Sequence, residues 1–235
     1  VNDTPASARE GLHDLAVAPD GRLFATWLDL RNGPTELWSA RSDDGGLTWR
    51  SNERVYRSAD KSICECCHPS ARFDGEGNLA VLWRNSLHGA RDPWMITRAA
   101  GAAEFAQAKK VGVGTWQLNG CPMDGGQIVA WGGGRFGAIF QRNGEIILGS
   151  PEGAEKPLGK GKQPVALPAG ERVIAFWQQG AELIGASGDS ATAPTRYGNQ
   201  ARFASLAVLP GGEGTFLAFE TGPAKGPVTI VIERL

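Results

Sequence analysis

One pattern recurs five times along the chain: a short apolar strand, a Gly-rich turn, and a second apolar strand that ends in or beside an aromatic residue. The aromatic positions of the five copies are Trp27, Trp83, Phe140, Trp177 and Phe219. Successive copies are separated by roughly 48 residues, the length of a four-stranded propeller blade. The repeat therefore predicts an all-β fold, a β-propeller with five blades of four antiparallel strands.

Composition favours the same fold class. The chain contains 33 Gly and 14 Pro among 235 residues, a share typical of a protein with many turns. Apolar residues do not follow a helical period over any long stretch, and the Ala-rich segment 99–110 is interrupted by Gly101. We therefore expect little helix.

The two ends of the chain bear on how a ring of blades would close. The last repeat offers three strands, and residues 1–11 precede the first repeat. Because an open ring would expose strand edges, we expect residues 1–11 to add the outer strand of the last blade, so that residues 1–235 form a single propeller domain. The alternative is a propeller of six blades in which one is truncated.

Charge and hydrophobicity exclude some classes of partner. Lys and Arg number 24 against 25 Asp and Glu, so no overall positive field would attract nucleic acid. No run of about 18 apolar residues is present, so we do not expect the protein to span a membrane. Any ligand must be recognised locally.

Residues 42–49 read Ser-Asp-Asp-Gly-Gly-Leu-Thr-Trp, which fits the pattern S-x-D-x-G-x-T-W. Asp44 can accept hydrogen bonds from its own turn, and the glycines permit positive φ. The segment resembles the Asp box of the sialidase-like, or BNR-repeat, β-propeller family. In that family the box is a structural device, so the resemblance implies the fold and leaves activity open.

Two further segments, ICECCHPS and NGCPMDG, resemble a pattern of extracytoplasmic bacterial members of the sialidase-like family that have no established activity. This resemblance implies a periplasmic or secreted protein. Catalytic sialidases carry an Arg-Ile-Pro segment, which this chain lacks. No catalytic residue is therefore transferred to this sequence by motif.

The repeat register brings the unusual side chains to one end of the blades. In a propeller, the inner strands begin at the face where the loops between second and third strands lie, and ligands usually bind there. All four cysteines and all three histidines of the chain map to these positions: Cys64, Cys66, Cys67, Cys121, His13, His68 and His88. We therefore expect Cys121 to lie close to the other cysteines although more than fifty residues separate them.

The cysteines allow three interpretations. In an oxidising compartment, Cys121 could form a disulfide with a cysteine of the cluster, and a vicinal Cys66–Cys67 bond would be strained. Alternatively, the four thiolates with His68 or Met123, or with His13 or His88, offer ligands that copper(I) and zinc prefer. Finally, residues 64–68 fit C-x-x-C-H, the attachment pattern of haem c. We do not expect haem, because Pro69 and an inner strand follow directly.

Charged residues at the same end suggest two other activities. Five arginines could together bind an acidic group on a glycan or a protein partner: Arg31, Arg84, Arg91, Arg142 and Arg202. Alternatively, several of them pair with neighbouring aspartates. A glycosidase would need two carboxyl groups, or a Tyr nucleophile with a carboxylate partner. The candidates are Asp14, Asp92, Asp124, Glu220 and Tyr197.

The sequence thus predicts an extracytoplasmic propeller that acts as a binding module or accessory subunit, with a soft metal, an acidic glycan or a protein as ligand. An exo-acting glycoside hydrolase of the sialidase type is the alternative function.

Overall fold

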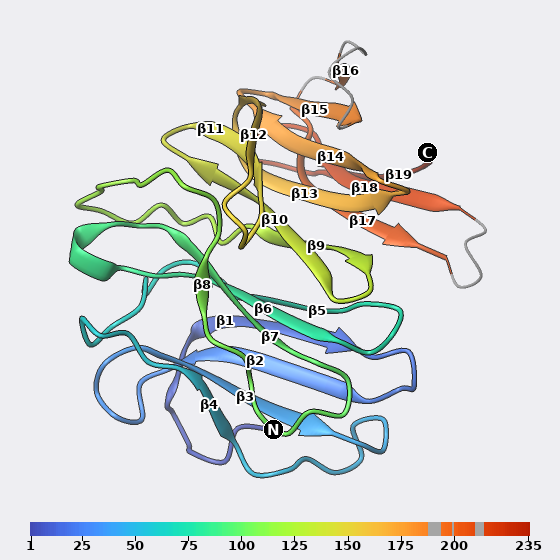
Figure 1. Ribbon diagram of the computed structural model, residues 1–235. Helices are drawn as coiled ribbons and strands as arrows, with labels where there is room; N and C mark the ends of the chain where they lie inside the picture. Colours follow the sequence, from blue (N-terminus) through green and yellow to red (C-terminus); the bar gives the residue numbers. More distant parts are fainter. Residues whose placement is uncertain (188–193, 199, 210–213) are drawn as a thin grey trace. The chain divides into compact units, whose positions relative to one another are not determined.

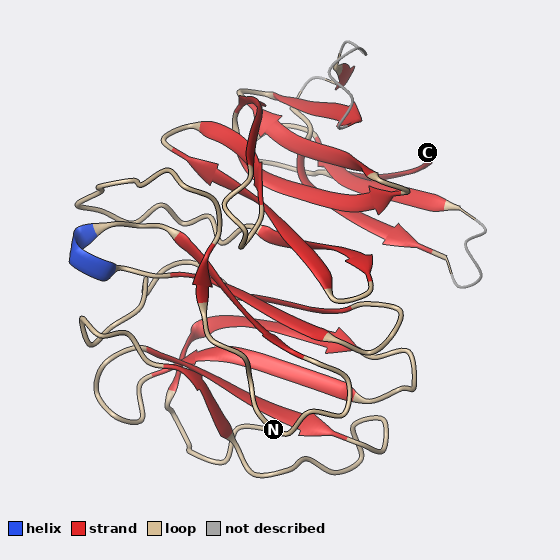
Figure 2. Cartoon of the chain, in the orientation of Figure 1, coloured by secondary structure: helices blue, strands red, loops and turns tan. Residues whose placement is uncertain are grey.

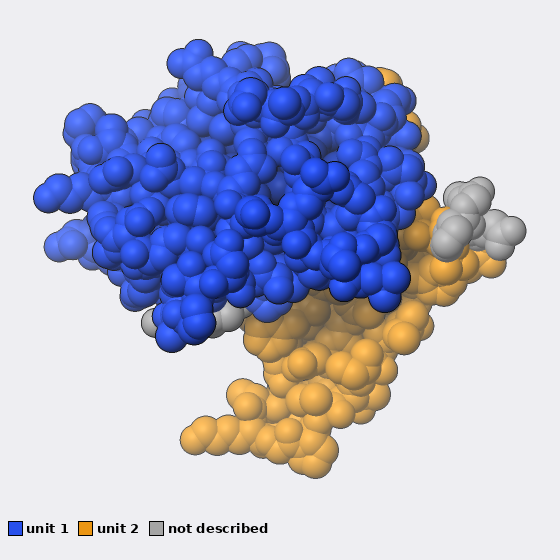
Figure 3. Space-filling view, turned by 90° about the horizontal axis from the view of Figure 1, so that it is seen from below, with its two compact units in different colours: residues 1–138, 149–155 blue, residues 139–148, 156–235 orange. Residues whose placement is uncertain are grey.

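The computed structural model describes residues 1–187, 194–198, 200–209 and 214–235. It divides into two compact units, which Figure 3 distinguishes by colour. Unit 1 comprises residues 1–138 and 149–155, and unit 2 comprises residues 139–148 and 156–235. The prediction of one closed propeller domain stays a prediction.

Unit 1 contains two complete four-stranded sheets, each with its strands in chain order (Figure 1). The first sheet consists of β1 (Ala8–Val17), β2 (Leu23–Asp29), β3 (Glu36–Ser42) and β4 (Glu53–Tyr56). The second consists of β5 (Ser70–Phe73), β6 (Leu79–Arg84), β7 (Pro93–Arg98) and β8 (Lys109–Lys110). The inner strands are neighbours, because β1 contacts β5 and β5 contacts β9.

The strands of the third sheet belong partly to unit 1 and partly to unit 2. They are β9 (Gln127–Gly132), β10 (Arg135–Arg142), β11 (Glu145–Gly149) and β12 (Glu155–Lys160).

Unit 2 contains the last two sheets. The fourth sheet consists of β13 (Lys162–Ala169), β14 (Arg172–Gln179), β15 (Glu182–Ser187) and β16 (Thr195–Tyr197). The fifth consists of three described strands, β17 (Arg202–Val208), β18 (Thr215–Thr221) and β19 (Thr229–Arg234). Residues 210–213, where the repeat pattern predicts the Gly-rich turn of the fifth copy, lie outside the described residues. Five antiparallel sheets are thus confirmed, and four of them have four strands.

The five aromatic positions of the repeat occupy equivalent places, as predicted. Each lies in the second strand of its sheet, and each is at most 6% exposed. Among the described residues the structure contains one short helix, a 3-10 turn at Leu87–Gly89 (Figure 2), and segment 99–110 forms turns that lead into β8. The prediction of little helix is therefore confirmed.

Burial on both faces explains why the second strands read as continuous apolar runs. Every residue of β6 is buried, including Arg84 at its end. One core cluster joins the first two sheets, with Phe24 and Leu28 on one side and Val81 and Trp83 on the other. A strand with one solvent-exposed face alternates polar and apolar residues. A strand that neighbouring sheets cover on both faces does not, because both sets of side chains are buried.

The N-terminal segment requires a correction. Residues 8–11 do not form an outer strand of the fifth sheet, because β1 begins at Ala8 and pairs with β2, with Ala8 opposite Asp29. Before β1, the Asp3 main-chain N–H donates to Asn52 Oδ1, and the Asn52 main-chain N–H donates to the Asp3 carboxylate, in the loop that precedes β4. The first strand is longer than predicted because it continues past a register irregularity between Ala8 and His13.

The Asp box forms the turn after β3. Asp44 accepts hydrogen bonds from the Ser42 hydroxyl at 2.7 Å and from the Thr48 main-chain N–H at 2.9 Å. Gly46 has a φ of 95° and donates its N–H to Ser42 Oγ at 2.8 Å. Positive φ is accessible to glycine without steric cost, so the box closes a tight turn, as the sequence predicted.

Replacing Asp44 by Ala is expected to lower the melting temperature in a pH-dependent way. Hydrogen bonds from Thr48 and Ser42 lower the pKa of Asp44 from 3.8 to about 2. A carboxylate whose folded pKa lies below its unfolded pKa stabilises the fold above the unfolded value, and this contribution is lost as pH falls through the folded value. Thermal melts should therefore show a deficit for Asp44→Ala that shrinks between pH 3.8 and about 2.

The matched control for this experiment is Asp43→Ala, which removes only an exposed ion pair to Arg50. It should leave the melting temperature nearly unchanged. A deficit of Asp44→Ala that stays constant across the acid range would contradict the assignment of the stabilisation to the ionised carboxylate.

Among the described residues, no helix is long and apolar enough to cross a membrane.

Candidate metal centre

The cysteine cluster lies in the loop between β4 and β5, where main-chain bonds hold it against neighbouring strands. Ile63 donates its N–H to the carbonyl of Thr35 at 3.0 Å, and Cys64 donates to the carbonyl of Arg84 at 2.9 Å. Ile63 is buried in the core cluster of the first two sheets. The loop is thereby fixed at the end of β6.

Three cysteine sulfurs of this loop lie together. Cys64 Sγ is 3.8 Å from Cys66 Sγ and 3.6 Å from Cys67 Sγ, and the three sulfurs are all within 4.8 Å of one another. The fourth cysteine, Cys121, precedes β9, and its side chain interacts with the Cys66 thiol. Cys121 is thus a neighbour of Cys66, but its sulfur does not belong to the group of three that lie close to one another.

The environments of the three clustered thiols differ. A hydrogen bond from Cys64 lowers the pKa of Cys67 to about 6, and the charge of Arg84 and the main-chain N–H of Asp124 act in the same direction. The same hydrogen bond raises the pKa of Cys64. Burial, followed by the interaction with Cys121, raises the pKa of Cys66 to about 12. Without a bound ion, the cluster thus favours one thiolate, on Cys67.

Arg84 stands behind this thiolate and is 1% exposed. Its Nε and Nη2 atoms donate to the carbonyl of Asp124 at 3.1 and 2.9 Å, and Nη1 donates to the carbonyl of Arg91 at 2.6 Å. Asp124 belongs to the segment that also carries Cys121. Arg84 therefore connects the two cysteine-bearing segments through main-chain carbonyls, and it does not present its guanidinium to an external ligand.

The other predicted metal ligands are not gathered around the sulfurs. His68 is exposed and does not belong to the group of mutually close ligand atoms. Its ring lies against Gly125, where an added Cβ would meet the imidazole at 3.0 Å. Met123 is 72% exposed and interacts with Cys66 through its main-chain N–H. His13 and His88 are also exposed, and His88 Nδ1 lies 3.5 Å from Asp60.

The predicted arginine candidates have separate partners. Arg31 forms ion pairs with Asp29 and Asp3 and lies over the ring of Trp38. Arg91 donates to the carbonyl of Gly120 at 3.4 Å. In unit 2, Arg202 pairs with Glu220 at 3.2 Å, and Arg142 ends β10. Arg31 and Arg202 therefore pair with nearby carboxylates, as the alternative interpretation of the arginines expected.

The carboxylate candidates for catalysis are likewise held by neighbours. Asp92 is buried, lies 3.2 Å from the Lys110 ammonium and accepts the N–H of Trp116. Asp14 accepts the main-chain N–H groups of Leu15 and Ala71. Asp124 is buried beside the cysteine cluster.

Tyr197 lies in the described part of unit 2, just before an inner strand, as predicted. It ends the outer strand β16, opposite Leu183, and the inner strand β17 begins at Arg202. Its ring packs edge-on against Phe176 and Phe219, with centroids 5.5 and 6.1 Å away. Burial raises its pKa, which makes the phenol a poorer nucleophile.

Unit 2 has a pocket of about 690 Å³ at the ends of β14, β17 and β18. Gln178, Arg202, Phe203 and Glu220 are among its lining residues. Glu220 is the one carboxylate that lines it in the described part of the chain. This pocket therefore lacks the pair of carboxyl groups that glycoside hydrolysis requires.

Comparison with known proteins gives no match by sequence: no protein-family profile fits the chain, and no curated protein is similar to it. By structure, 97% of the chain superposes on 56% of a Hadza microbial sialidase, with a TM-score of 0.61 and 14% identity. The chain thus spans little more than half the length of that sialidase.

Two further structures are similar over almost the whole chain. One is AofleA from Arthrobotrys oligospora, with a TM-score of 0.61 and 14% identity over 98% of this chain and 71% of that protein. The other is a family 117 glycoside hydrolase from Zobellia galactanivorans, with a TM-score of 0.55 and 12% identity over 99% of this chain and 86% of that enzyme. At these identities the similarity shows the fold alone. Together with the five antiparallel sheets, it supports a sialidase-like β-propeller fold.

Proposed function

We propose that this protein binds one soft metal ion, zinc or copper(I), through Cys64, Cys66 and Cys67, and that it acts as a binding module built around that centre. The spacing of the sulfurs carries the proposal. Around a tetrahedral ion with metal–sulfur bonds of about 2.3 Å, neighbouring sulfurs lie about 3.8 Å apart. The two distances measured from Cys64 Sγ are 3.6 and 3.8 Å.

Cys121 is the best candidate for a fourth ligand. Its thiol interacts with Cys66, whereas the side chains of His68 and Met123 are exposed. Cys121 is itself exposed, so it lies where an ion could enter from solvent. The complete set would be four thiolates, a combination typical of structural zinc sites and suited to soft ions in general.

The local charges support binding. A thiolate, and not a thiol, is the metal ligand, so each cysteine must lose its proton. Cys67 already favours the thiolate, because the Cys64 hydrogen bond and the charge of Arg84 lower its pKa. Several thiolates around one ion leave a net negative charge, which the buried guanidinium of Arg84 offsets.

The disulfide and haem alternatives fit the structure less well. A disulfide needs sulfurs about 2.05 Å apart, so Cys64 and Cys67, whose sulfurs are 3.6 Å apart, would have to approach by about 1.5 Å. Haem c would require thioether bonds to Cys64 and Cys67, and these two residues are 3% and 1% exposed. A porphyrin has no access to sulfurs buried to that extent.

The glycoside hydrolase alternative has support from the similar solved structures and none from the candidate residues. The Hadza protein is named a sialidase, and the Zobellia protein a family 117 glycoside hydrolase. In this chain, Tyr197 is held in aromatic packing and Glu220 is paired with Arg202. A glycan partner that is bound without hydrolysis agrees with these contacts. The periplasmic or secreted location stays a prediction from the resemblance.

Metal analysis of the full chain, purified without oxygen, tests the proposal. Elemental analysis should find one zinc or copper per chain, and the thiols should react with a thiol reagent only after a chelator is added. Cobalt(II) substitution should give thiolate-to-cobalt charge-transfer bands whose intensity reports the number of sulfur ligands. In Cys67→Ser these bands should be lost, and in Cys121→Ser they should weaken without vanishing.

Two results would overturn the proposal. One is mapping of stoichiometric disulfides among these cysteines in anaerobically purified protein that takes up no metal. The other is four freely reactive thiols in the presence of added zinc and of added copper(I). Cysteines that form disulfides only after exposure to air, with metal bound before it, would agree with the proposal.

A further inference from the structure

Another pocket lies in unit 1, at the end of β6 that is opposite the cysteine cluster. Leu79 at the start of β6 lines this pocket and pairs with Arg98, whereas Arg84 at the end of β6 binds the cysteine loop. At about 3.3 Å per residue, the two ends of β6 are roughly 17 Å apart. The pocket has a volume of about 260 Å³ and is a site separate from the metal centre.

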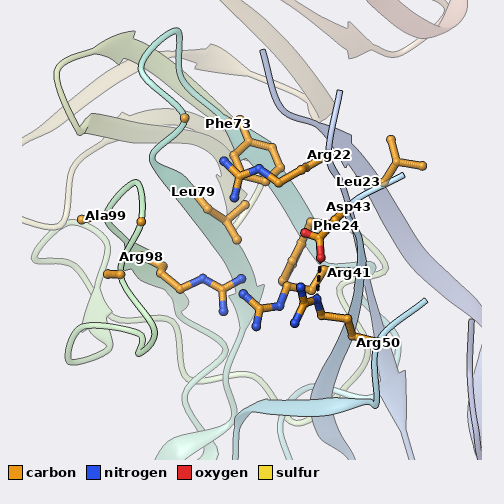
Figure 4. A pocket seen from close by; sticks show the side chains of 13 residues that line it. Arg22, Leu23, Phe24, Arg41, Asp43, Arg50, Phe73, Leu79, Arg98 and Ala99 are labelled. Atoms are coloured by element: carbon orange, nitrogen blue, oxygen red, sulfur yellow. Dashed lines mark hydrogen bonds and ion pairs between the residues drawn. The ribbon is translucent and has the colours of Figure 1, made fainter. Parts of the chain in front are cut away.

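Four arginines line this pocket, and we call it the arginine pocket. They come from four different segments: Arg22 precedes β2, Arg41 lies in β3, Arg50 follows the Asp box, and Arg98 ends β7. Asp43 is the one carboxylate among the lining residues. In Figure 4 the side chain of Arg98 enters the pocket from the side opposite Arg41 and Arg50.

Carboxylates partner three of these arginines. Arg22 forms an exposed ion pair with Asp20, and Arg50 with Asp43. Arg98 donates from Nη1 to Glu53 at 3.1 Å. Arg41 is thus the one arginine of the pocket for which no carboxylate partner is found among the described residues.

Arg41 has no side-chain hydrogen bond or ion pair with any residue that the structure describes. It is half-buried, and its charge lowers the pKa of the Arg98 guanidinium across the pocket. The two like charges therefore repel each other. A guanidinium has five N–H donors in a planar fork, so an unpaired one is a ready oxyanion ligand.

Arg98 provides the second half of the site. It is 6% exposed, and its guanidinium stacks 4.4 Å from the ring centre of Phe105. Its one hydrogen bond to a described residue is that from Nη1 to Glu53, so its remaining N–H donors lack protein acceptors within the described chain. Burial lowers the pKa of Arg98, and the charges of Arg41 and Arg22 lower it further. An anion in the pocket could accept these remaining N–H donors through charge-assisted hydrogen bonds.

We propose that the arginine pocket binds a tetrahedral oxyanion, the sulfate or phosphate group of a small ligand, between Arg41 and Arg98. Two guanidinium groups that face each other from opposite walls suit an anion with acceptor oxygens on several sides better than a planar carboxylate. Phe24 and Leu79 add apolar surface to the lining, against which the non-ionic part of a ligand could pack.

Isothermal titration of the full chain at low ionic strength tests the proposal with three probes. Sodium sulfate and sodium phosphate report the free ions, and a monosaccharide sulfate, compared with the unsulfated sugar, reports the ester. Sodium chloride and acetate at matched ionic strength serve as references. Saturable binding of sulfate or phosphate, with acetate much weaker, is expected. Tighter binding of the sugar sulfate would identify the ester as the ligand, and binding of the free ions alone would identify an inorganic ion.

The variant Arg41→Gln is the decisive one, because the Arg41 side chain makes no hydrogen bond or ion pair with the described residues and its main-chain bonds in β3 are kept. It should bind the oxyanion at least about tenfold more weakly, and without ligand it should melt at the same or a higher temperature, since a repulsive charge is removed. Arg54→Gln is the matched control, since Arg54 pairs with Glu36 outside the pocket; its oxyanion affinity should be unchanged. Unaltered sulfate and phosphate binding in Arg41→Gln, absence of saturable binding in the parent, or acetate binding as tight as sulfate would overturn the proposal.

Discussion

Replacing Trp83 by Ala should reduce the free energy of unfolding by about 3–5 kcal/mol, the usual cost of truncating a buried Trp in a core. Trp83 is fully buried as the penultimate residue of β6, and its ring centre lies 4.5 Å from that of Tyr56. It belongs to the core cluster in which the first and second sheets meet, so the cavity would open between two sheets. Urea denaturation of the parent and the variant, followed by circular dichroism, measures the difference.

Trp94→Ala is the matched control for this prediction. Trp94 lies on β7, directly opposite Trp83 of β6. It is half-buried and packs against the same core cluster. Its loss should cost less, because less apolar surface returns to water and the site can partly collapse. Equal destabilisation by the two substitutions would contradict the prediction that the repeated aromatic position, Trp83, contributes more to the core than Trp94 does.

The repeated aromatic positions could be predicted because their cause is local and periodic. A second strand between two neighbouring sheets is buried on both faces, and this selects apolar runs such as residues 79–83. The pairing of the N-terminal residues could not be predicted in the same way. Residues 8–11 extend an inner strand across a register irregularity, and no residue pattern announces such an irregularity.

The cysteine cluster was also predictable, because the repeat register places Cys121 and the cysteine loop before adjacent inner strands. The role of Arg84 was not. Its guanidinium was expected to face a ligand, and the structure directs it to two main-chain carbonyls, whose positions depend on tertiary packing. The arginine pocket was not predicted, since its arginines come from four separate segments without a shared motif. The one available signal was that Arg41 and Arg50 flank the Asp box.

Replacing Arg84 by Met should destabilise the protein by about 3–5 kcal/mol, a loss comparable to that of Trp83→Ala. Met retains much of the apolar bulk, but it removes three charge-assisted hydrogen bonds and leaves the carbonyls of Asp124 and Arg91 buried without these donors. Because these bonds connect the two cysteine-bearing segments, the damage should extend to the metal centre. Urea denaturation measures the first effect, and competition with a chelator measures the second.

Arg84→Lys separates charge from geometry at this position. A lysine ammonium keeps the positive charge near Cys67 and cannot bond both carbonyls in the planar arrangement of a guanidinium. Since the pKa of Cys67 is lowered first by the Cys64 hydrogen bond and then by the charge of Arg84, Arg84→Met should raise it, and Arg84→Lys should largely preserve it. Thiolate absorbance followed by pH titration of the metal-free protein measures this pKa. If both variants shifted it equally, Arg84 would act on the cluster by positioning the loop and not by its charge.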